Sequence, residues 1–264
     1  MSGTLLLSGG GVKAIAFIGA LKKLGELEYK FNKYITVSAG SIVGLLCIIG
    51  YTPDELISKV YSTDFTELVE LRLNNVVKKY GLDSGKRVIG WLERLMMEKG
   101  FSSDMTFSQL YSKTQLHYQV LTTNLNTRTQ TTFDYLVTPD VQVLRAIRMS
   151  IGIPFVYTIR KYKGDIHVDG SLLSNYPVHL ITTSDPLAIG LRLVPEQTSR
   201  KDIHDILEYI TNILSCLVNS RMPPERSYTI NIHTGGNAVQ FDIGKTQKET
   251  LVEQGYNSVE RHFN

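Results

Sequence analysis

Residues 34–41 read Tyr34-Ile35-Thr36-Val37-Ser38-Ala39-Gly40-Ser41, and an apolar run from Ile42 to Ile49 follows them directly. The first four residues predict a short buried strand, and the uniformly apolar run predicts a central helix that ends at Gly50. Ser38 therefore lies on a tight turn between a strand and a helix. Such a turn is expected to expose the serine hydroxyl above the sheet edge, with the helix N-terminus pointing toward it.

This arrangement is typical of a nucleophile elbow, usually written Gly-x-Ser-x-Gly. In that motif the backbone N–H after the serine supplies half of an oxyanion hole. Thr36 occupies the position of the first glycine, so a β-branched side chain must fit where the strand and helix pass closest. A strand, a serine-rich turn and a buried helix without any chemistry would give the same pattern, and this stretch alone does not separate the two interpretations.

The composition predicts one globular α/β domain that spans residues 1–264. The chain is 42% apolar and 20% charged, and it contains no linker, repeat or low-complexity tract. Its net charge of +3 is far below that of nucleic-acid-binding proteins, so we predict no nucleic-acid partner, although weak attraction to anionic membranes is compatible with it. No apolar run reaches the roughly 18 residues that cross a bilayer, which predicts a cytoplasmic protein, peripheral to membranes at most.

The residues that bind metals or form disulfides are sparse. Cys47 and Cys216 are the two cysteines, and each lies in a predicted buried helix, where a thiol behaves as a small hydrophobic group. The sequence has neither a His-Glu-x-x-His motif nor the acidic spacing of an EF-hand. We therefore predict no metal site and no cofactor.

A glycine-rich loop follows the first predicted strand, Thr4 to Leu7, and leads into a helix. It reads Ser8-Gly9-Gly10-Gly11-Val12-Lys13-Ala14. Consecutive glycines at a helix N-terminus let backbone N–H groups converge on an anion, either a reaction oxyanion or a phosphate. The pattern also fits the dinucleotide fingerprint, but that motif needs an acidic residue at the end of the second strand, where this chain has Ser38. The oxyanion is therefore favoured.

A second stretch with potential chemistry is Ile166-His167-Val168-Asp169-Gly170-Ser171. Residues 166–168 predict a short strand, so Asp169 stands at a strand end, as Ser38 does. Taken alone, Asp169-Gly170 would be interpreted as an ordinary turn.

The remaining elements follow from periodicity and capping. Residues 51–114, inserted directly after the elbow helix, are predicted to be helical and to be mostly core. Part of this insertion could instead cap the site, with Phe101, Met105 and Phe107 as acyl-chain contacts. We also expect paired strands at 116–125 and 129–135, a helix from Thr138 to about Ser150, strands at 188–193 and 228–233 around an amphipathic helix at 202–219, and a final helix beginning at Thr246.

Several blocks together resemble the patatin-like phospholipase family. The match covers about residues 4 to 180 and implies a three-layer α/β/α fold, with a central mostly parallel sheet, that hydrolyses lipid acyl esters. Ala14 and Thr36 depart from the family's usual glycines, and both are expected to narrow the pocket. The blocks are Gly9-Gly10-Gly11-Val12-Lys13-Ala14, Ser38-Ala39-Gly40-Ser41, Arg148-Met149-Ser150-Ile151-Gly152-Ile153-Pro154, Asp169-Gly170-Ser171 and Asn175-Tyr176-Pro177-Val178.

The resemblance also implies a role for each reacting group. Ser38 would be the nucleophile and Asp169 its base, forming a Ser-Asp dyad. The backbone amides of Gly10, Gly11 and Ala39 would form the oxyanion hole. The implied substrate is a phospholipid or glycerolipid ester, reached at a membrane surface to which the protein binds transiently.

A catalytic histidine is the main alternative to Asp169 as the base, because the imidazole pKa lies near neutrality. In the order serine, aspartate, histidine, the candidates are His204 and His233. His204 falls on the polar face of a predicted helix, whereas His233 precedes a Thr-Gly-Gly loop. His167 lies on the same strand face as Asp169 and could instead orient that carboxylate.

Arg160, Lys161 and Lys163 form a basic cluster just before the strand that carries Asp169. The cluster predicts a contact with anionic membranes, and an exposed hairpin tip without that function is an equally good interpretation. Two other functional classes remain consistent with the sequence. One is a catalytically weak lipid-binding or scaffold protein with the same fold, and the other is a nucleotide-binding protein that uses the glycine loop.

Overall fold

The computed structural model describes residues 2–264 except 183–184, 197–202, 204–205, 221–222, 225 and 237. His204 lies outside the described residues. The strands are β1 (Gly3–Leu7), β2 (Phe31–Val37), β3 (Gly81–Asp83), β4 (His117–Asn124), β5 (Thr129–Phe133), β6 (Phe155–Tyr157), β7 (Arg160–Tyr162), β8 (Asp165–Asp169), β9 (Ile189–Pro195) and β10 (Thr229–Thr234). The α-helices are α1 (Ile15–Glu26), α2 (Ala39–Ile48), α3 (Pro53–Ser62), α4 (Leu73–Lys79), α5 (Lys86–Glu98), α6 (Phe107–Thr114), α7 (Val143–Ser150), α8 (Ser171–Ser174), α9 (Ile206–Asn219) and α10 (Lys245–Phe263), and the 3-10 helices are η1 (Gly11–Ala14), η2 (Phe65–Leu68) and η3 (Val178–Leu180).

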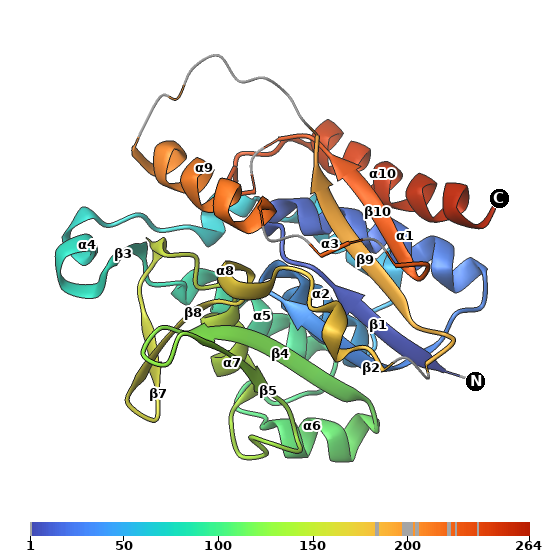
Figure 1. Cartoon of the computed structure of the whole chain (residues 1–264), viewed down its shortest axis with the longest axis horizontal. Coiled ribbons are helices and arrows are strands. Elements are labelled where there is room, and N and C mark those ends of the chain that lie inside the picture. Colours follow the sequence, from blue (N-terminus) through green and yellow to red (C-terminus); the bar gives the residue numbers. More distant parts are fainter. Residues whose placement is uncertain are drawn as a thin grey trace.

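The main sheet has eight strands in the order β10-β9-β1-β2-β4-β8-β7, with β5 also paired to β4 (Figure 1). Neighbouring strands from β10 to β4 are parallel, whereas β5, β8 and β7 join antiparallel. Strands β3 and β6 form a separate pair. Helices cover both faces of the sheet, which confirms the predicted three-layer α/β/α fold with a mostly parallel sheet.

The register of β4 brings the two candidate reacting groups together. On one edge, β4 pairs with β5 over residues 120–124. The other edge of β4 therefore pairs with two strands in succession. It pairs first with β2, which ends with Val37 opposite Leu121. It then pairs with β8, in which Asp169 lies opposite Thr122. The carboxyl ends of β2 and β8 thus meet at adjacent positions of β4. Ser38, the residue after Val37, and Asp169 become neighbours although 131 residues separate them.

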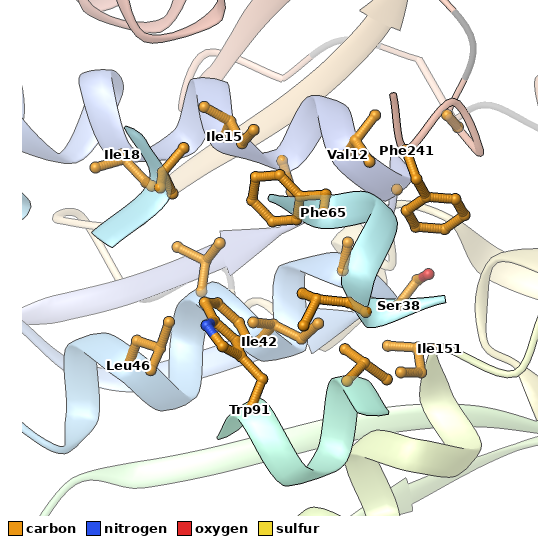
Figure 2. Close-up of a pocket in the computed structure, with 18 of the residues that line it drawn as sticks. Val12, Ile15, Ile18, Ser38, Ile42, Leu46, Phe65, Trp91, Ile151 and Phe241 are labelled. Atoms are coloured by element: carbon orange, nitrogen blue, oxygen red, sulfur yellow. The ribbon is translucent and has the colours of Figure 1, made fainter. Parts of the chain in front are cut away.

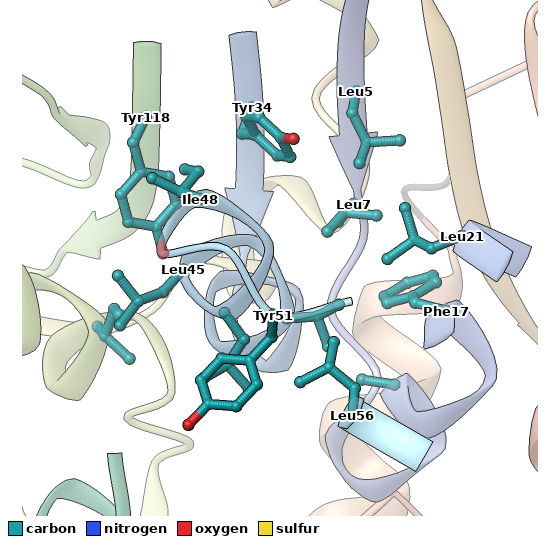
Figure 3. Packing of buried hydrophobic residues seen from close by; sticks show 14 of the residues in the cluster. Leu5, Leu7, Phe17, Leu21, Tyr34, Leu45, Ile48, Tyr51, Leu56 and Tyr118 are labelled. Carbon is teal, nitrogen blue, oxygen red and sulfur yellow. The ribbon is translucent and has the colours of Figure 1, made fainter. Parts of the chain in front are cut away.

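The core on one face of the sheet is built from the elements that carry the elbow. Leu5 and Leu7 of β1 pack against Phe17 of α1, and Leu45 of α2 packs near Tyr118 of β4 (Figure 3). All five side chains are buried, with at most 2% of their surface exposed. Burying an apolar side chain of this size contributes about 1.5 to 3 kcal/mol, so the layer beneath α2 holds the elbow rigidly.

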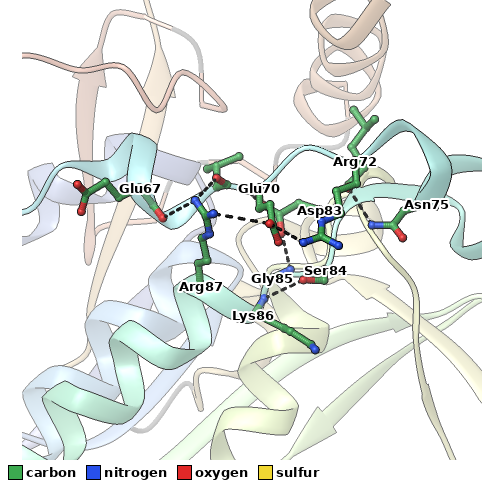
Figure 4. A network of polar contacts seen from close by, with 11 residues as sticks. Glu67, Glu70, Arg72, Asn75, Asp83, Ser84, Gly85, Lys86 and Arg87 are labelled. Carbon is green, nitrogen blue, oxygen red and sulfur yellow. Dashed lines mark hydrogen bonds and ion pairs between the residues drawn. The ribbon is translucent and has the colours of Figure 1, made fainter.

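The insertion between α2 and β4 is fixed by a polar network around the buried carboxylate of Asp83 (Figure 4). Asp83 accepts backbone N–H groups of Glu70 at 2.7 Å and Gly85 at 2.6 Å. Arg87 donates to the carbonyl oxygens of Glu67 and Val69, both at 3.3 Å. These bonds tie η2 to the start of α5, and residues from both helices line the cavity described below.

Three local predictions were wrong in detail. Helix α7 begins at Val143 rather than Thr138, because the Thr138 hydroxyl and N–H both donate to the carbonyl of Asp134 and close a turn. The last helix begins at Lys245, where the N–H of Gly244 donates to the Gln247 side chain at 2.9 Å. Cys216 is exposed on α9, because this helix covers a cavity instead of packing into the core.

Among the described residues, no helix combines the length and apolar character needed to cross a bilayer.

Candidate active site

Ser38 sits at the N-cap of α2 with φ 50° and ψ −129°, a region that residues other than glycine rarely adopt. A backbone in such a region costs on the order of 1 to 3 kcal/mol and persists only where its surroundings fix it. Here the Ser38 N–H donates to the Ser150 hydroxyl at 2.9 Å, and that hydroxyl donates to the carbonyl of Leu121 at 2.6 Å. Ser150, at the end of α7, therefore holds the elbow. Ser150 belongs to the block from Arg148 to Pro154 that carries the family resemblance, but no local feature of the sequence indicates this supporting role.

The structure shows how Thr36 fits beneath the elbow. Its side chain is fully buried and its hydroxyl donates to the carbonyl of Gln119 at 2.8 Å. Gly44 of α2 faces it, and a Cβ on Gly44 would lie 2.7 Å from Thr36 Cγ2. The close approach of strand and helix is thus made by a glycine on the helix instead of one on the strand.

The Ser38 hydroxyl donates to Asp169 Oδ2 at 2.6 Å, and Asp169 Oδ1 accepts the Ser171 N–H at 2.8 Å. Both Ser38 and Asp169 are 4% exposed, so the predicted exposed hydroxyl is instead buried at the base of a cavity. Burial raises the pKa of Asp169 to about 6, while the hydrogen bonds from Ser38 and Ser171 oppose this shift. The carboxylate is therefore ionised at neutral pH but close enough to its pKa to exchange a proton.

The glycine loop passes directly over Ser38. A Cβ on Gly9 would lie 3.0 Å from Ser38 Cβ, and the Gly9 N–H donates to Asn175 Oδ1 at 3.0 Å. In the described part of the chain, no hydrogen-bond partner is found for the N–H groups of Gly10, Gly11 and Ala39. All three amides lie at or just before helix N-termini, where positive dipole ends favour a negatively charged oxygen.

Two cavities meet at Ser38. The narrower, of about 120 Å3, runs from Ser38 into the helical layer and is lined almost entirely by apolar side chains. Figure 2 shows Ser38 at one end and Ile18 and Leu46 toward the other. The wider, of about 380 Å3, is lined by the glycine loop, Asp169, Lys13 and the inner side of α9. Ser38, Gly11, Ile153 and Ala238 line both cavities.

The insertion caps the apolar cavity, but not through the three residues predicted from the sequence. Phe101 and Phe107 are buried in the core, and Met105 packs against that core. The insertion instead supplies another set of lining residues. They are Leu56, Lys59, Val60, Phe65, Leu68, Val88, Trp91 and Leu95.

The described residues that line either cavity include no histidine. His233 lines a different cavity, between β10 and α10. His167 is buried, and its Nδ1 lies 2.9 Å from the Thr122 hydroxyl. Burial lowers the pKa of His167, which favours a neutral ring. Its ring thus contacts Thr122, the residue opposite Asp169 in the sheet, and no hydrogen bond joins it to the carboxylate in the described structure.

The predicted basic cluster divides into two parts. Arg160 is half-buried in β7 and donates to the carbonyl of Ser84 at 2.8 Å, so its guanidinium is committed to the fold. Lys161 and Lys163 are exposed at the tip of the β7–β8 hairpin.

Comparison with known proteins places the chain in a family. Residues 5–181 match the model of the patatin-like phospholipases. The uncharacterized protein R571 of Acanthamoeba polyphaga mimivirus is 28% identical over 98% of this chain and 93% of its own length. A probable lipid hydrolase, 463L of Invertebrate iridescent virus 6, is 31% identical over 67% of this chain and 62% of its own.

Similarity in three dimensions extends to solved structures. VipD from Legionella pneumophila superposes with a TM-score of 0.68 at 14% identity, over 99% of this chain and 66% of the VipD chain. At that identity the likeness concerns the fold alone. Taken with the family match over residues 5–181, it leads to one conclusion: the chain belongs to the patatin-like phospholipase family.

Proposed function

We propose that this protein is a serine lipid acyl hydrolase that uses a Ser38–Asp169 dyad. The observation that carries the proposal is the 2.6 Å hydrogen bond between two buried side chains, at the point where an apolar cavity meets the glycine loop. Family membership and the relative named as a probable lipid hydrolase support the same class of reaction.

In the proposed reaction, the Ser38 oxygen attacks the ester carbonyl carbon while its proton passes to Asp169. The negative charge that develops on the carbonyl oxygen is stabilised by the N–H groups of Gly10, Gly11 and Ala39. When the tetrahedral intermediate collapses, Asp169 returns the proton to the leaving alcohol. Water, deprotonated by Asp169, then attacks the carbonyl carbon of the acyl-enzyme. The bond from that carbon to the Ser38 oxygen breaks, Asp169 gives its proton to Ser38, and the fatty acid leaves. Every proton transfer uses one carboxylate, and no cofactor is required.

The two cavities support a lipid ester as the substrate. The narrow apolar cavity suits an acyl chain, because it offers apolar surface and few polar partners. The wider cavity is lined by both Lys13 and Glu196, and Lys13 supplies a cation suited to a phosphate near the leaving alcohol. We therefore propose phospholipids or neutral glycerolipids as substrates, with a phospholipid favoured by Lys13.

We further propose that the enzyme meets its substrate transiently at a membrane surface. Lys161 and Lys163 carry exposed positive charge at the hairpin tip, and each basic residue near an anionic surface contributes on the order of 1 kcal/mol. Arg160 is left out of this contact, because its guanidinium is bonded within the fold.

The test is hydrolysis by the full chain of phosphatidylcholine vesicles and of a soluble ester, p-nitrophenyl butyrate, each beside the Ser38→Ala variant. Release of fatty acid that disappears in the variant supports the proposal. Vesicle binding without turnover of either substrate would instead support a lipid-binding or scaffold protein, and stabilisation by nucleotides would support the glycine loop as a nucleotide site.

A further inference from the structure

A set of apolar side chains is exposed on α9, whose other side lines the wider cavity, and on the neighbouring strands. On α9 they are Tyr209, Ile213 and Leu217, which are spaced by four residues and therefore share one face of the helix. The other side of α9 faces the cavity through residues such as Leu214 and Val218. Helix α9 thus has an apolar outer face, whereas its inner side mixes apolar residues with polar ones such as Asn212 and Ser215 and is the side with a function in the proposed site.

Helix α9 also lacks the charge of an ordinary exposed helix. Its 14 residues include a single charged one, Glu208. A helix that faces water normally carries charged or polar residues on its outer side. The outer face of α9 is therefore suited to an environment less polar than water.

A second group of exposed apolar side chains lies beside α9, on the strand pair β3–β6. Phe155 of β6 is exposed, and Tyr80 directly precedes Gly81, the residue paired with Phe155. Helix α9 lies close to β6, so the two groups belong to neighbouring elements. Phe155 and Tyr80, with Tyr209, Ile213 and Leu217, form what we call the rim face; their exposed fractions range from 44% to 60%.

The backbone at Phe155 supports a function for its exposed ring. Phe155 has φ 68°, a left-handed conformation that costs energy for a bulky residue. It follows Ile153 and Pro154, which line the wider cavity. Asparagine would adopt this conformation more easily, so the fold alone does not explain a phenylalanine here.

Basic side chains flank the rim face. Lys78 and Lys79 form the end of α4, immediately before Tyr80, and both are exposed. The β7–β8 hairpin with Lys161 and Lys163 projects from the same end of the sheet (Figure 1). The register fixes the direction of this hairpin. Residues 165 to 169 run antiparallel to β4 over about 13 Å, starting beyond its carboxyl end and ending at the level of Ser38. The tip of the hairpin therefore extends past the carboxyl end of β4.

We infer that the rim face is a membrane-docking surface that inserts apolar side chains into an anionic lipid leaflet while the flanking lysines contact the head groups. The combination of exposed aliphatic and aromatic residues with a basic border matches such a leaflet in both polarity and charge. Docking there would place the mouth of the wider cavity against the lipid, so that an ester could reach Ser38 without crossing water. The role of this surface in delivering substrate rests on the proposed function, whereas the vesicle-binding test does not depend on hydrolysis.

The test measures vesicle binding of full-length protein that carries Ser38→Ala, so that no lipid is consumed. Vesicles of phosphatidylcholine alone and of phosphatidylcholine mixed with phosphatidylglycerol are compared by flotation. The test variant adds Phe155→Asn, Ile213→Gln and Leu217→Gln, none of which lines a cavity around Ser38. We expect it to bind the mixed vesicles at least about tenfold more weakly, because apolar insertion is lost.

A matched control uses Leu136→Gln with Val137→Gln. These side chains are 65% and 70% exposed but follow β5 at the amino end of β4, the opposite end of the sheet from the rim face. The control should bind as the parent does. A second variant, with Lys78, Lys79, Lys161 and Lys163 all changed to glutamine, should lose binding to the mixed vesicles and the salt dependence of that binding.

Equal binding by the triple variant and the parent, or an equal loss in the control, would overturn the inference. So would a parent dimer, measured by light scattering, that the triple variant converts to monomer, because the rim face would then join two copies of the chain. Hydrolysis of p-nitrophenyl butyrate by the triple variant with Ser38 restored should equal that of wild type. If wild type hydrolyses no ester, the proposed function fails while the binding result stands by itself.

Discussion

The apolar cavity and the wider cavity share Ser38 but are built from different parts of the fold. The first is lined by α1, α2, α3 and α5, the same helices whose side chains form the core, and measures about 120 Å3. The second measures about 380 Å3 and lies between the glycine loop, the end of β8 and α9. Under the proposed function, selectivity for the acyl chain would therefore be tied to stability, whereas selectivity for the polar part of the substrate could change with little effect on the core.

The junction of the two cavities should show the largest effect. Ser38→Ala and Asp169→Asn should each lower hydrolysis of p-nitrophenyl butyrate by at least about a thousandfold, and the double variant should be no worse than either single one. Initial rates, with circular dichroism as a check on folding, measure this. Appreciable turnover by both single variants would show that Ser38 and Asp169, at the junction of the cavities, do not carry out the hydrolysis.

The burial of Asp169, the proposed base, should also cost stability at neutral pH. Burial raises the pKa of Asp169 from 3.8, its ordinary value, to about 6 in the folded protein. Protonation of Asp169 therefore favours the folded state. This contribution to stability is fully present below about pH 3.8 and is lost as the pH rises through about 6. Relative to wild type, Asp169→Asn should therefore gain up to about 3 kcal/mol in unfolding free energy between pH 4 and pH 8. Urea denaturation of both proteins across this range measures the difference. A constant difference would show that the carboxylate is not desolvated.

The two cavities should respond to different substrates. Trp91→Ala enlarges the apolar cavity and should raise the ratio of kcat/KM for long over short acyl chains by roughly tenfold, with some loss of stability. Lys13→Met removes the cation of the wider cavity and should lower hydrolysis of phospholipid relative to neutral diacylglycerol by roughly tenfold. Kinetics on matched substrate series would test both. If either variant changed both selectivities equally, the cavities would not have separate roles.

The smallest effect is expected away from both cavities. His233→Ala should change hydrolysis by less than about twofold, because His233 lies in the separate cavity beside α10. A loss of about a thousandfold would point to a histidine base.

Much of this site could be predicted from the sequence, because motifs at strand ends are local features. The strand before Ser38, the helix after it, and Asp169 at the end of β8 were predicted and are confirmed. The contacts between distant segments could not be predicted in the same way. Ser150 supports the elbow only because α7 packs on β4 and ends beside the turn at Ser38, and Gly44 makes room for Thr36 only because α2 crosses β2.

Burial also depends on packing that periodicity does not describe. Ser38 was expected to be exposed but lies at the base of a cavity, because the insertion and α9 rise around it. Conversely, the apolar pattern of α9 predicted a buried helix, whereas its outer face is open. An apolar stripe shows that a helix face avoids water but does not identify what covers it.

Labelling with a fluorophosphonate probe tests the central claim most directly, because the probe reacts preferentially with an activated serine. Mass spectrometry of the labelled peptide should place the probe on Ser38, and the rate in wild type should rise with pH around a midpoint near 6, as Asp169 ionises. Ser38→Ala should take up no probe, and Asp169→Asn should react at least about a hundredfold more slowly at every pH. Labelling at another residue, or Asp169→Asn reacting as fast as wild type, would contradict the Ser38–Asp169 dyad.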